Sequence, residues 1–588
     1  MNQSANPTQQ IILVYVPQPT YNTRGQPALV FGETNKNLLE LTLPGLLLVK
    51  VLDHPNQPAV ISWTGVTLTY RELYHRSELL AHSLFKYGVC AGDHVAILSE
   101  NCEIYIELLF AIAMVGGVSV VLNTNYTPVE LVTALKAADC KVLFTSTHIG
   151  PRSIESSLAH VLGILEHDES FRHLLQHVIL IRPKSLAWET SKFVSTLGKF
   201  LSVSDPRDCH LDSQRAAYDV CNIQFTSGTT GNPKASMLSH RNIINNAQLI
   251  GDRMALTSQD IICSPPPLFH CFGLVLGMLA CITHGSTFVL PCPTFKADLV
   301  VDHLVAYSCT GLLGVPTMLI SVLEEHEKRG SPPLVLRTGI AAGASVPRAV
   351  VERMRSKFGF QEFINVYGMT ETAPASFTTS MSDPLEKKLT TVGTILPHTG
   401  AKVVDQQGKV LRRGERGELC TSGYNLQKGY YKNEAKTAEA MRVEDGVTWM
   451  YTGDEAIIDE QGYCYITGRI KDIIIRGGEN IAPLEIEERL MLRSDITLAS
   501  VVGLADERYG EAVSAFVTLA DGATRPSATE LQEFVQQTLG RHKTPLHIFW
   551  VGRDGDLDAF PTTASGKLQK EKLRIWGNAR IKSRRSKL

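Results

Sequence analysis

Residues 226–234 form the most informative stretch of the chain, and they read Thr226-Ser227-Gly228-Thr229-Thr230-Gly231-Asn232-Pro233-Lys234. A short apolar run, Cys221–Phe225, precedes them and predicts a strand. The glycines permit a tight turn that exposes successive backbone amides, while the hydroxyls and the lysine supply further donors. The stretch therefore predicts a loop that wraps a polyphosphate.

The spacing in this loop disfavours a P-loop NTPase. The motif G-x-x-x-x-G-K-[ST], counted from Gly228, requires a glycine at the position of Pro233. It also requires Ser or Thr after the lysine, where the chain has Ala235. An ordinary turn rich in Ser, Thr and Gly is the structural alternative to a phosphate site.

Helical and strand patterns alternate on the N-terminal side of this loop. Apolar residues recur at helical spacing over Tyr70–Tyr87, and a second helix is expected over Glu103–Val115. Short apolar runs predict strands at His94–Ser99 and Val118–Leu122. Strand–helix–strand order predicts an α/β fold with parallel sheets layered with helices.

The length of 588 residues predicts more than one domain. Near residue 470 a strand pattern at Ile473–Ile475 is broken by Gly477-Gly478, and Pro483 then opens a helix over Leu484–Leu492. We expect a loose leader over residues 1–36, a large domain over 37–468, a hinge at 469–472, a small α+β domain over 473–575 and a basic tail over 576–588.

Composition excludes several classes of partner and site. The chain has 57 basic and 59 acidic residues, so its overall charge gives no attraction to nucleic acid. Its 12 cysteines form no C-x-x-C pair, which favours free thiols over structural zinc. Two stretches lack charged residues, Leu108–Val129 and Ile261–Phe295, but Gly, Pro and polar residues interrupt both. They predict buried segments rather than transmembrane spans.

The chain ends in Ser586-Lys587-Leu588, a tripeptide that peroxisomal import receptors read as an address. Basic residues precede it at 580, 582, 584 and 585. We interpret them as a solvated tail that presents the address rather than as a nucleic-acid site. The sequence thus predicts a peroxisomal location and an import receptor as a partner.

The loop at 226–234 resembles the signature loop of the adenylate-forming superfamily, which includes acyl-CoA synthetases, luciferases and the adenylation domains of peptide synthetases. The resemblance covers residues from about 65 to 575, because further segments follow in the family's order. These segments are Pro266–His270, Gly339–Val346, Asn365–Glu371, Tyr451–Asp454, Gly468–Pro483 and Pro561–Lys567. The family fold has a large N-terminal domain, which binds AMP and the acid, and a small mobile C-terminal domain.

The resemblance also assigns the nucleotide contacts. It implies that the loop holds the phosphates, that Tyr367 stacks on adenine and that Thr370 binds the α-phosphate. Glu371, with Thr229, is implied as the Mg²⁺ site, and a carboxylate suits that hard cation. The remaining implied nucleotide-binding residues are Gly343, Ala344, Ser345, Asn365, Gly368, Met369, Asp454 and Arg469. For Gly339–Val346, a tightly packed strand-to-loop junction explains the glycines equally well.

Four further residues take roles from the resemblance. Lys567 is implied as the catalytic lysine, which acts with Thr370, Glu371 and His270, and His270 lines the carboxylate entrance. Lys471 matches the hinge, and Gly478 matches the glycine past which the pantetheine arm of coenzyme A runs. Coumarate-type and luciferase-type members carry a lysine where this chain has Ile475. That difference argues against those two subgroups. The sequence of residues 473–480, Ile-Ile-Ile-Arg-Gly-Gly-Glu-Asn, is similar to medium-chain acyl-CoA synthetases.

We therefore expect an ATP-dependent, AMP-forming acid–thiol ligase that uses Mg·ATP, coenzyme A and a small carboxylic acid. The acid is expected to be fatty in type, medium-chain or modified, and the chain resembles fungal peroxisomal ligases of toxin or secondary-metabolite pathways. Two alternatives stay open: an adenylation enzyme that loads a carrier protein, and a catalytically silent nucleotide-binding protein. A luciferase-type oxygenase is a weaker third alternative.

Overall fold

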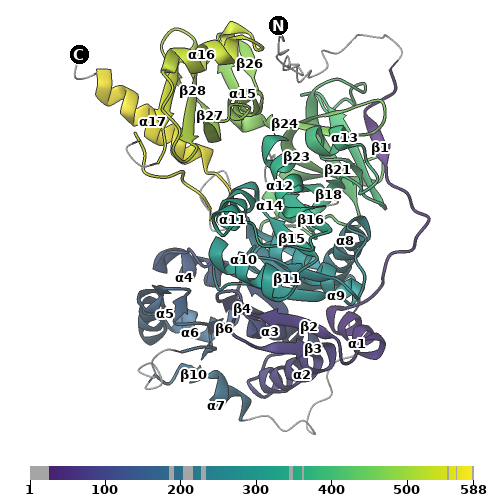
Figure 1. Cartoon of the computed structure of the whole chain (residues 1–588). Helices are drawn as coiled ribbons and strands as arrows, with labels where there is room; N and C mark the ends of the chain where they lie inside the picture. Colours follow the sequence, from purple (N-terminus) through teal and green to yellow (C-terminus); the bar gives the residue numbers. More distant parts are fainter. Residues whose placement is uncertain are drawn as a thin grey trace.

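The computed structural model describes residues 25–183, 191–202, 216–226, 234–342, 348–360, 363–552, 555–563 and 566–585. Two large sheets and a third, antiparallel sheet make up most of the molecule, and a separate sheet forms the C-terminal part (Figure 1). Among the helices of these residues, none combines the length and hydropathy that a membrane span requires.

The first large sheet has seven strands, and all neighbours are parallel except the last pair. Their order is β10 (Val194–Thr196), β9 (His177–Leu180), β6 (Cys140–Thr145), β4 (His94–Leu98), β5 (Val118–Val121), β11 (Val220–Thr226) and β12 (Lys234–Ser239). The strands predicted at 94–99, 118–122 and 221–225 are confirmed by β4, β5 and β11. β11 and β12 flank the stretch at 226–234, so they set the direction in which it leaves the sheet.

The second large sheet has nine strands, parallel in its interior and antiparallel at its edges. Their order is β19 (Thr394–Ile395), β18 (Ala375–Thr378), β17 (Ile364–Gly368), β16 (Thr338–Ala342), β15 (Gly311–Gly314), β13 (Ile261–Cys263), β14 (Thr287–Leu290), β2 (Pro58–Ser62) and β3 (Thr67–Thr69).

Helices fill the space between these sheets and cover their outer faces. The central layer holds α1 (Leu43–Asp53), α2 (Tyr70–Lys86), α3 (Glu103–Met114), α8 (His240–Arg253), the π-helix η3 (Phe272–Leu279) and α9 (Ala280–His284). Side chains of β4 alternate between the two faces of the sheet. Val95 and Ile97 pack into this central layer, whereas Ala96 and Leu98 are buried in the cluster on the opposite face. The helices predicted at 70–87 and 103–115 are confirmed by α2 and α3.

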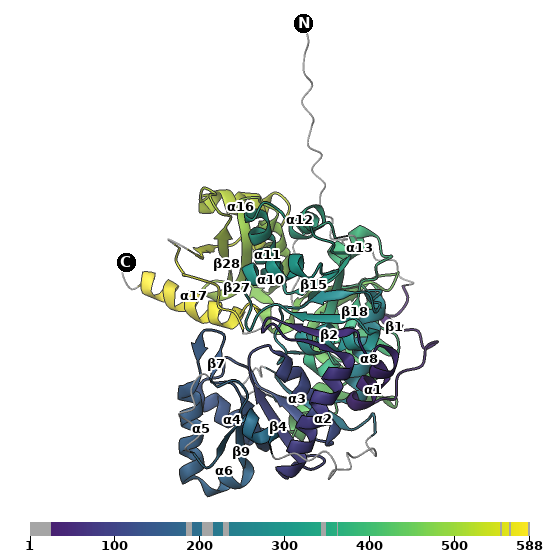
Figure 2. The ribbon, with the colours of Figure 1, turned by 60° about the horizontal axis from the view of Figure 1, so that its bottom comes forward.

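The outer helices complete five layers. α4 (Pro128–Ala137), α5 (Glu155–His167) and α6 (Glu169–Leu174) cover the seven-stranded sheet, as Figure 2 shows. α10 (Ala297–Ala306), α11 (Pro316–Lys328) and α12 (Arg348–Phe358) cover the nine-stranded sheet. The uncharged stretch 261–295 forms β13, η3, α9 and β14 inside this packing, as its apolar composition predicts.

The third sheet has six strands and is antiparallel. It contains β1 (Leu29–Phe31), β20 (Thr399–Val404), β21 (Gly417–Gly423), β23 (Val447–Ile458), β22 (Met441–Glu444) and β24 (Cys464–Arg469). The prediction of a loose leader over 1–36 is wrong for Leu29–Phe31, because β20 supplies a pairing partner and Val30 packs into the core below. Three residues are too few to reveal such a strand by periodicity.

The C-terminal sheet joins β26 (Glu479–Ile481), β25 (Ile474–Arg476), β28 (Gly510–Leu519), β27 (Ile496–Asp506) and β29 (His547–Trp550). α15 (Pro483–Met491) and α16 (Ala528–Gln536) pack on one face, and α17 (Lys570–Arg585) covers the other. The predicted small α+β fold and its Pro483 helix are thus present. The domain boundaries stay predictions, although β24 ends at Arg469 and a 3₁₀ turn, η5, occupies Ile470–Asp472.

An ion pair joins the C-terminal part to the third sheet. Arg416 Nη2 lies 3.0 Å from Glu485 Oε1 at the start of α15. Lys543, which belongs to the C-terminal part itself, pairs with the other oxygen of Glu485. Glu485 therefore has one cationic partner on each side of the boundary.

Candidate active site

Among the described residues, Thr226, Gly368 and Arg469 each close a strand of one of the three sheets of the large part, and Asp454 lies opposite Arg469. Thr226 closes β11, Gly368 closes β17, and Asp454 and Arg469 lie opposite each other on β23 and β24. Ligands of open α/β sheets bind outside the carboxyl ends of parallel strands. The contacts described below connect these strand ends to each other and to the C-terminal part.

Glu371 is a buried carboxylate that ties together the two ends of the phosphate-loop stretch. Its Oε1 accepts hydrogen bonds from Thr226 Oγ1 at 3.1 Å and from the hydroxyl of Tyr430 at 2.8 Å. Lys234 Nζ donates to the same Tyr430 hydroxyl at 3.0 Å. Thr226 and Lys234 are the described residues on either side of the loop, so Glu371 faces its base.

Glu371 stands on η4 (Thr370–Thr372), and a tight approach of two strands sets the position of that turn. A Cβ atom at Gly368 would lie 1.8 Å from the carbonyl oxygen of Pro374, the residue just before the neighbouring strand β18, so only glycine fits. Met369 then starts the turn, and its backbone N–H donates to Thr372 Oγ1 at 3.1 Å. Close strand packing thus delivers Thr370 and Glu371 to the site.

Asn365 lies earlier on β17, and its hydrogen bonds in this structure are to neighbouring segments of the fold. Its side-chain amide donates to the carbonyl of Thr391 at 3.1 Å, and its backbone N–H donates to Thr379 Oγ1 at 2.8 Å. These contacts hold β17 against the residue after β18 and against the residue after α13 (Leu385–Thr390). The structure therefore does not bring the Asn365 amide to Glu371 or Asp454.

Asp454 carries two fixed partners. The Tyr367 hydroxyl donates to its Oδ2 at 2.7 Å, and Arg469 Nε lies 3.2 Å from its Oδ1. The carboxylate is 6% exposed. Burial, followed by the charge of Asp454, raises the pKa of Tyr367 well above its usual value, so the phenol stays a donor. A carboxylate has four acceptor positions, so Asp454 retains capacity for the hydroxyls of a bound ribose.

Lys567 comes from the C-terminal part and reaches this group. Part of the residue is exposed to water, but many protein atoms lie around its ammonium group. This partial loss of solvent, followed by the charge of Arg469, lowers the pKa of Lys567 to about 8. Asp454 and Asp472 oppose that shift. Burial, followed by the charge of Lys567, lowers the pKa of His270 to about 4. Near neutral pH the site therefore combines a neutral imidazole with an ammonium that titrates unusually low.

The loop that carries Lys567 docks on the large part. Thr317 Oγ1, at the N-terminal end of α11, lies 3.4 Å from the carbonyl oxygen of Gly566. Gly566 has φ +82°, and a Cβ there would lie 3.0 Å from Val315 Cγ2. Within the loop, Lys567 N–H donates to Thr563 Oγ1 at 3.0 Å. The left-handed backbone and this close approach both favour glycine next to the lysine.

Lys471 and Gly478 lie apart from this group. Lys471 is exposed in η5, at the junction of the two parts. Gly478 occupies the turn between β25 and β26 with φ +87°, and a Cβ there would meet no atom within 4 Å. The structure therefore combines a Lys567 whose loop docks on the large part with a Gly478 that is exposed to solvent.

Several predicted residues lie outside the described residues. These are Ser227, Gly228, Thr229, Thr230, Gly231, Asn232 and Pro233 of the loop, then Gly343, Ala344 and Ser345, and finally Ser586, Lys587 and Leu588. Their roles stay predictions. The predicted Mg²⁺ partner Thr229 belongs to this set, whereas its partner Glu371 is described.

Glu371 suits a divalent cation only together with oxygen atoms from a bound substrate, such as its phosphates. Both of its hydrogen bonds to described residues end on Oε1, which leaves Oε2 as an oxygen donor of the type that Mg²⁺ prefers. Over the described ranges, no group of three or more His, Cys, Asp or Glu side chains could hold a metal ion alone. Mg²⁺ commonly binds through one or two carboxylates plus substrate phosphates, and Glu371 fits that pattern.

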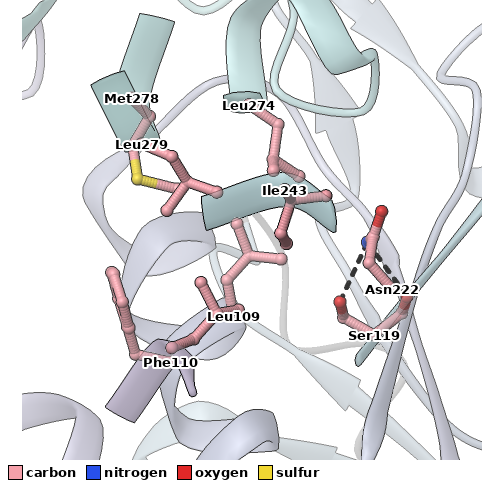
Figure 3. A pocket seen from close by; sticks show the side chains of 9 residues that line it. Leu109, Phe110, Ser119, Asn222, Ile243, Leu274, Met278 and Leu279 are labelled. Carbon is pink, nitrogen blue, oxygen red and sulfur yellow. Dashed lines mark hydrogen bonds between the residues drawn. The ribbon is translucent and has the colours of Figure 1, made fainter. Parts of the chain in front are cut away.

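A small interior cavity lies away from these residues. It has a volume of about 10 Å³, enough for about one water molecule. Leu109, Phe110, Leu274 and Met278 supply most of its apolar lining, and Asn222, which donates to Ser119 Oγ at 3.0 Å, forms a polar corner (Figure 3). A cavity of this size cannot hold a substrate.

Tyr430 is the residue that the sequence did not single out. It lies in an irregular segment after β21, where no helix or strand periodicity marks a functional position. The only sequence signal is an aromatic pair beside a glycine, Gly429-Tyr430-Tyr431, which is unspecific. Its contact with Glu371 depends on folding, because 59 residues separate the two.

Comparisons with known proteins identify the family of the chain and relatives of its fold. Residues 49–431 match the family model described as AMP-binding enzyme, and residues 485–567 match that described as AMP-binding enzyme C-terminal domain. The chain is 46% identical over 550 residues to acyl-CoA ligase sidI of Aspergillus fumigatus, covering 93% of each chain. It is 33% identical to the mitochondrial medium-chain acyl-CoA ligase ACSF2 of Rattus norvegicus, covering 92% of this chain and 88% of that one.

A solved structure shows the same fold. ATP-bound MatB from Rhodopseudomonas palustris superposes with a TM-score of 0.76 at 27% identity, covering 92% of this chain and 99% of that chain. The similarity extends over both the large and the C-terminal parts. The whole described architecture therefore has a counterpart in a protein that was crystallised with ATP.

Proposed function

The chain belongs to the family of AMP-binding enzymes, and on that premise we propose that it is an ATP-dependent acyl-CoA ligase. It converts a carboxylic acid to acyl-AMP with release of pyrophosphate, and then to acyl-CoA with release of AMP. The relatives named acyl-CoA ligases, similar over almost their whole length, support this reaction. One observation carries the assignment of the site: the loop of the C-terminal part that bears Lys567 docks on α11 of the large part, where the charges of Asp454 and Arg469 act on Lys567 and its own charge acts on His270.

In the first half-reaction, a carboxylate oxygen of the acid attacks the α-phosphorus of ATP, and the bond to the bridging oxygen of pyrophosphate breaks. The ammonium of Lys567 lies where it can offset charge that builds between the acyl oxygen and the α-phosphate. Asp454 and Tyr367 hold the nucleoside, and the neutral His270 borders the acid. Mg²⁺, held by Glu371 with Thr229, would supply positive charge to the phosphates.

In the second half-reaction, the thiol of coenzyme A attacks the carbonyl carbon of the mixed anhydride, and AMP leaves. We propose that the C-terminal part first rotates about Lys471, which withdraws Lys567 and brings Gly478 to the site. The solvent position of Gly478 and the inward position of Lys567 suit the first step. Coenzyme A is thus a substrate whose entry depends on that rotation.

The acid is proposed to be fatty in type, medium-chain or modified. The amino-acid sequence of residues 473–480 and the similarity to ACSF2 support this class. A peroxisomal ligase of this kind suits either β-oxidation or a toxin or secondary-metabolite pathway.

Exchange of labelled pyrophosphate into ATP tests the proposed function. With Mg²⁺, ATP and acids from C6 to C18, we expect exchange that depends on the acid and is strongest within one range of chain length. Hydroxamate trapping of the acyl-adenylate identifies that acid. A folded sample that binds ATP yet shows no exchange with any acid would contradict the assignment.

The location of the enzyme is proposed from its last three residues. Removal of Ser586-Lys587-Leu588 is expected to move a fluorescently tagged chain from peroxisomes to the cytosol, because the import receptor reads the free C-terminal tripeptide. The tag belongs at the N-terminus, and replacement of Arg584 and Arg585 by glutamine provides a control that keeps the tripeptide. Peroxisomal fluorescence of the truncated chain would rule out this address.

A further inference from the structure

Residues 424–432, between β21 and α14 (Glu434–Ala440), form a segment that we call the strap. It has little regular structure, but hydrogen bonds tie it to three neighbouring elements. The Asn242 amide of α8 donates to the carbonyls of Tyr424 and Leu426, and the Asn425 amide donates to the carbonyl of Ala375 at 3.1 Å. The strap is therefore anchored at its start on α8 and β18.

The second half of the strap pairs with β12. Lys428 N–H donates to the Met237 carbonyl at 2.8 Å, Met237 N–H to the Gly429 carbonyl at 3.0 Å, and Tyr431 N–H to the Ala235 carbonyl at 2.8 Å. In addition, Gln427 N–H donates to the backbone carbonyl of Glu371 at 2.9 Å. The backbone on both sides of Tyr430 is thus fixed next to Lys234 and Glu371.

Tyr430 uses this position to bridge a cation and an anion. Its hydroxyl donates to Glu371 Oε1 at 2.8 Å and accepts from Lys234 Nζ at 3.0 Å, and the residue is 3% exposed. The ammonium also lies 4.4 Å from the centroid of the Tyr430 ring. Without this shared hydroxyl, the two oppositely charged groups could pair with each other, which would turn both away from an incoming ligand. The phenol keeps them apart and holds each in one orientation.

We propose that Tyr430 is a positioning residue for the adenylation half-reaction: through one hydroxyl it holds Glu371 and Lys234 at the two ends of the phosphate-loop stretch. The proposal rests on the proposed function, since it concerns the binding and reaction of ATP. Tyr430 itself need not touch ATP. Its effect is transmitted by Glu371, whose Oε2 accepts none of the hydrogen bonds that described residues make to this carboxylate, and by the ammonium of Lys234.

The chain offers a matched control for a test. Tyr431 stands next in the strap, and its hydroxyl also donates to a carboxylate at 2.8 Å, that of Asp139 in the turn after α4. Tyr430→Phe and Tyr431→Phe therefore remove the same atom and the same kind of hydrogen bond from adjacent residues. Only the first change reaches Glu371 and Lys234.

We expect Tyr430→Phe to lower the rate of acid-dependent ATP–pyrophosphate exchange about 10- to 100-fold, which is the usual effect of losing hydrogen bonds to charged groups. Calorimetric titration with ATP, without acid, should require a higher Mg²⁺ concentration for half-maximal binding. Conversion of supplied acyl-adenylate and coenzyme A to thioester should be unchanged, because that step uses no triphosphate. Tyr431→Phe should match the wild type in all three measurements.

A double-mutant cycle with Lys234→Met tests whether the hydroxyl acts through its partners. Because both changes break the same bridge, their effects on exchange should be clearly smaller in combination than the product of the single effects. Additive effects would overturn the proposal. So would equal exchange and Mg²⁺ dependence in Tyr430→Phe and Tyr431→Phe, or a melting temperature of Tyr430→Phe well below that of Tyr431→Phe, which would assign Tyr430 to stability alone. Failure of the wild type to exchange pyrophosphate would instead count against the proposed function.

Discussion

Lys567→Ala is expected to lower acyl-adenylate formation by about 100- to 1000-fold, and to leave the conversion of supplied acyl-adenylate to thioester near the wild-type rate. The ammonium is the cation that the C-terminal part contributes near Asp454 and Arg469. Loss of one preorganised electrostatic contact to the transition state typically costs about 3–4 kcal/mol. Rapid-quench measurement of each half-reaction separates the two rates. Equal losses in both half-reactions would contradict a role confined to the first.

The role of the Lys567 ammonium also predicts how pyrophosphate exchange depends on pH. With its pKa lowered to about 8, the free enzyme carries the ammonium below that pH and loses it above. The kcat/KM of pyrophosphate exchange should therefore fall as pH rises past about 8, whereas kcat should fall only at higher pH, because bound triphosphate favours the charged form. Lys567→Arg should remove this limb, since a guanidinium stays charged. An unchanged limb in that variant would assign the titration to another group.

Gly478→Trp is expected to produce the opposite defect: pyrophosphate exchange close to normal, and thioester formation lowered by at least about 100-fold. In this structure the glycine is exposed on the β25–β26 turn, and an added side chain meets no atom within 4 Å. The indole can therefore be accommodated while Lys567 faces the site. It would obstruct coenzyme A only if rotation carries this turn to the site, and single-turnover assays with each substrate measure that difference.

Gly478→Ala is the matched control, because both substitutions place an L side chain at φ +87°. That strain costs roughly 1–2 kcal/mol and is common to both variants, so comparison with alanine isolates the effect of bulk. If the tryptophan and alanine variants form thioester equally fast, Gly478 does not line the path of coenzyme A.

The fold of the large part could largely be predicted from the sequence, because its strands and helices are buried in regular patterns. β4, β5 and β11, and helices α2 and α3, appear where periodicity and capping place them. α2 even begins with a complete capping box between Thr69 and Glu72. The order of the strands within each sheet was not predictable, since it depends on pairings between residues far apart.

In the apolar stretch at 261–295, burial could be predicted from the sequence but the type of helix could not. Composition correctly predicts that it is buried, but not that Phe272–Leu279 forms a π-helix. Gly273 and Gly277 pack so closely that Cβ atoms there would lie 2.4 Å from the Pro267 carbonyl oxygen and 2.7 Å from Ser264 Oγ. Such contacts arise from the tertiary packing, to which hydrophobic periodicity is blind.

In the candidate site, too, some residues could be predicted from the sequence and others could not. Glu371, Asp454, Arg469 and Lys567 could be singled out because they belong to ordered motifs; the structure pairs Asp454 with Arg469, and the charges of both act on Lys567. Tyr430 belongs to an irregular strap, and its partners Glu371 and Lys234 are 59 and 196 residues away. Its importance follows from a geometry that only the folded chain contains.

The ion pair at the boundary of the two parts bears on how often the enzyme can cycle. Arg416 is 39% exposed, and such solvent-exposed pairs contribute at most about 1 kcal/mol, less in salt. If the C-terminal part rotates as proposed, Glu485 would lose Arg416 but keep its ion pair with Lys543, so its carboxylate would not be left without a cationic partner. On the proposed rotation, this ion pair would favour one orientation of the C-terminal part and would itself add only a small free-energy cost to its release.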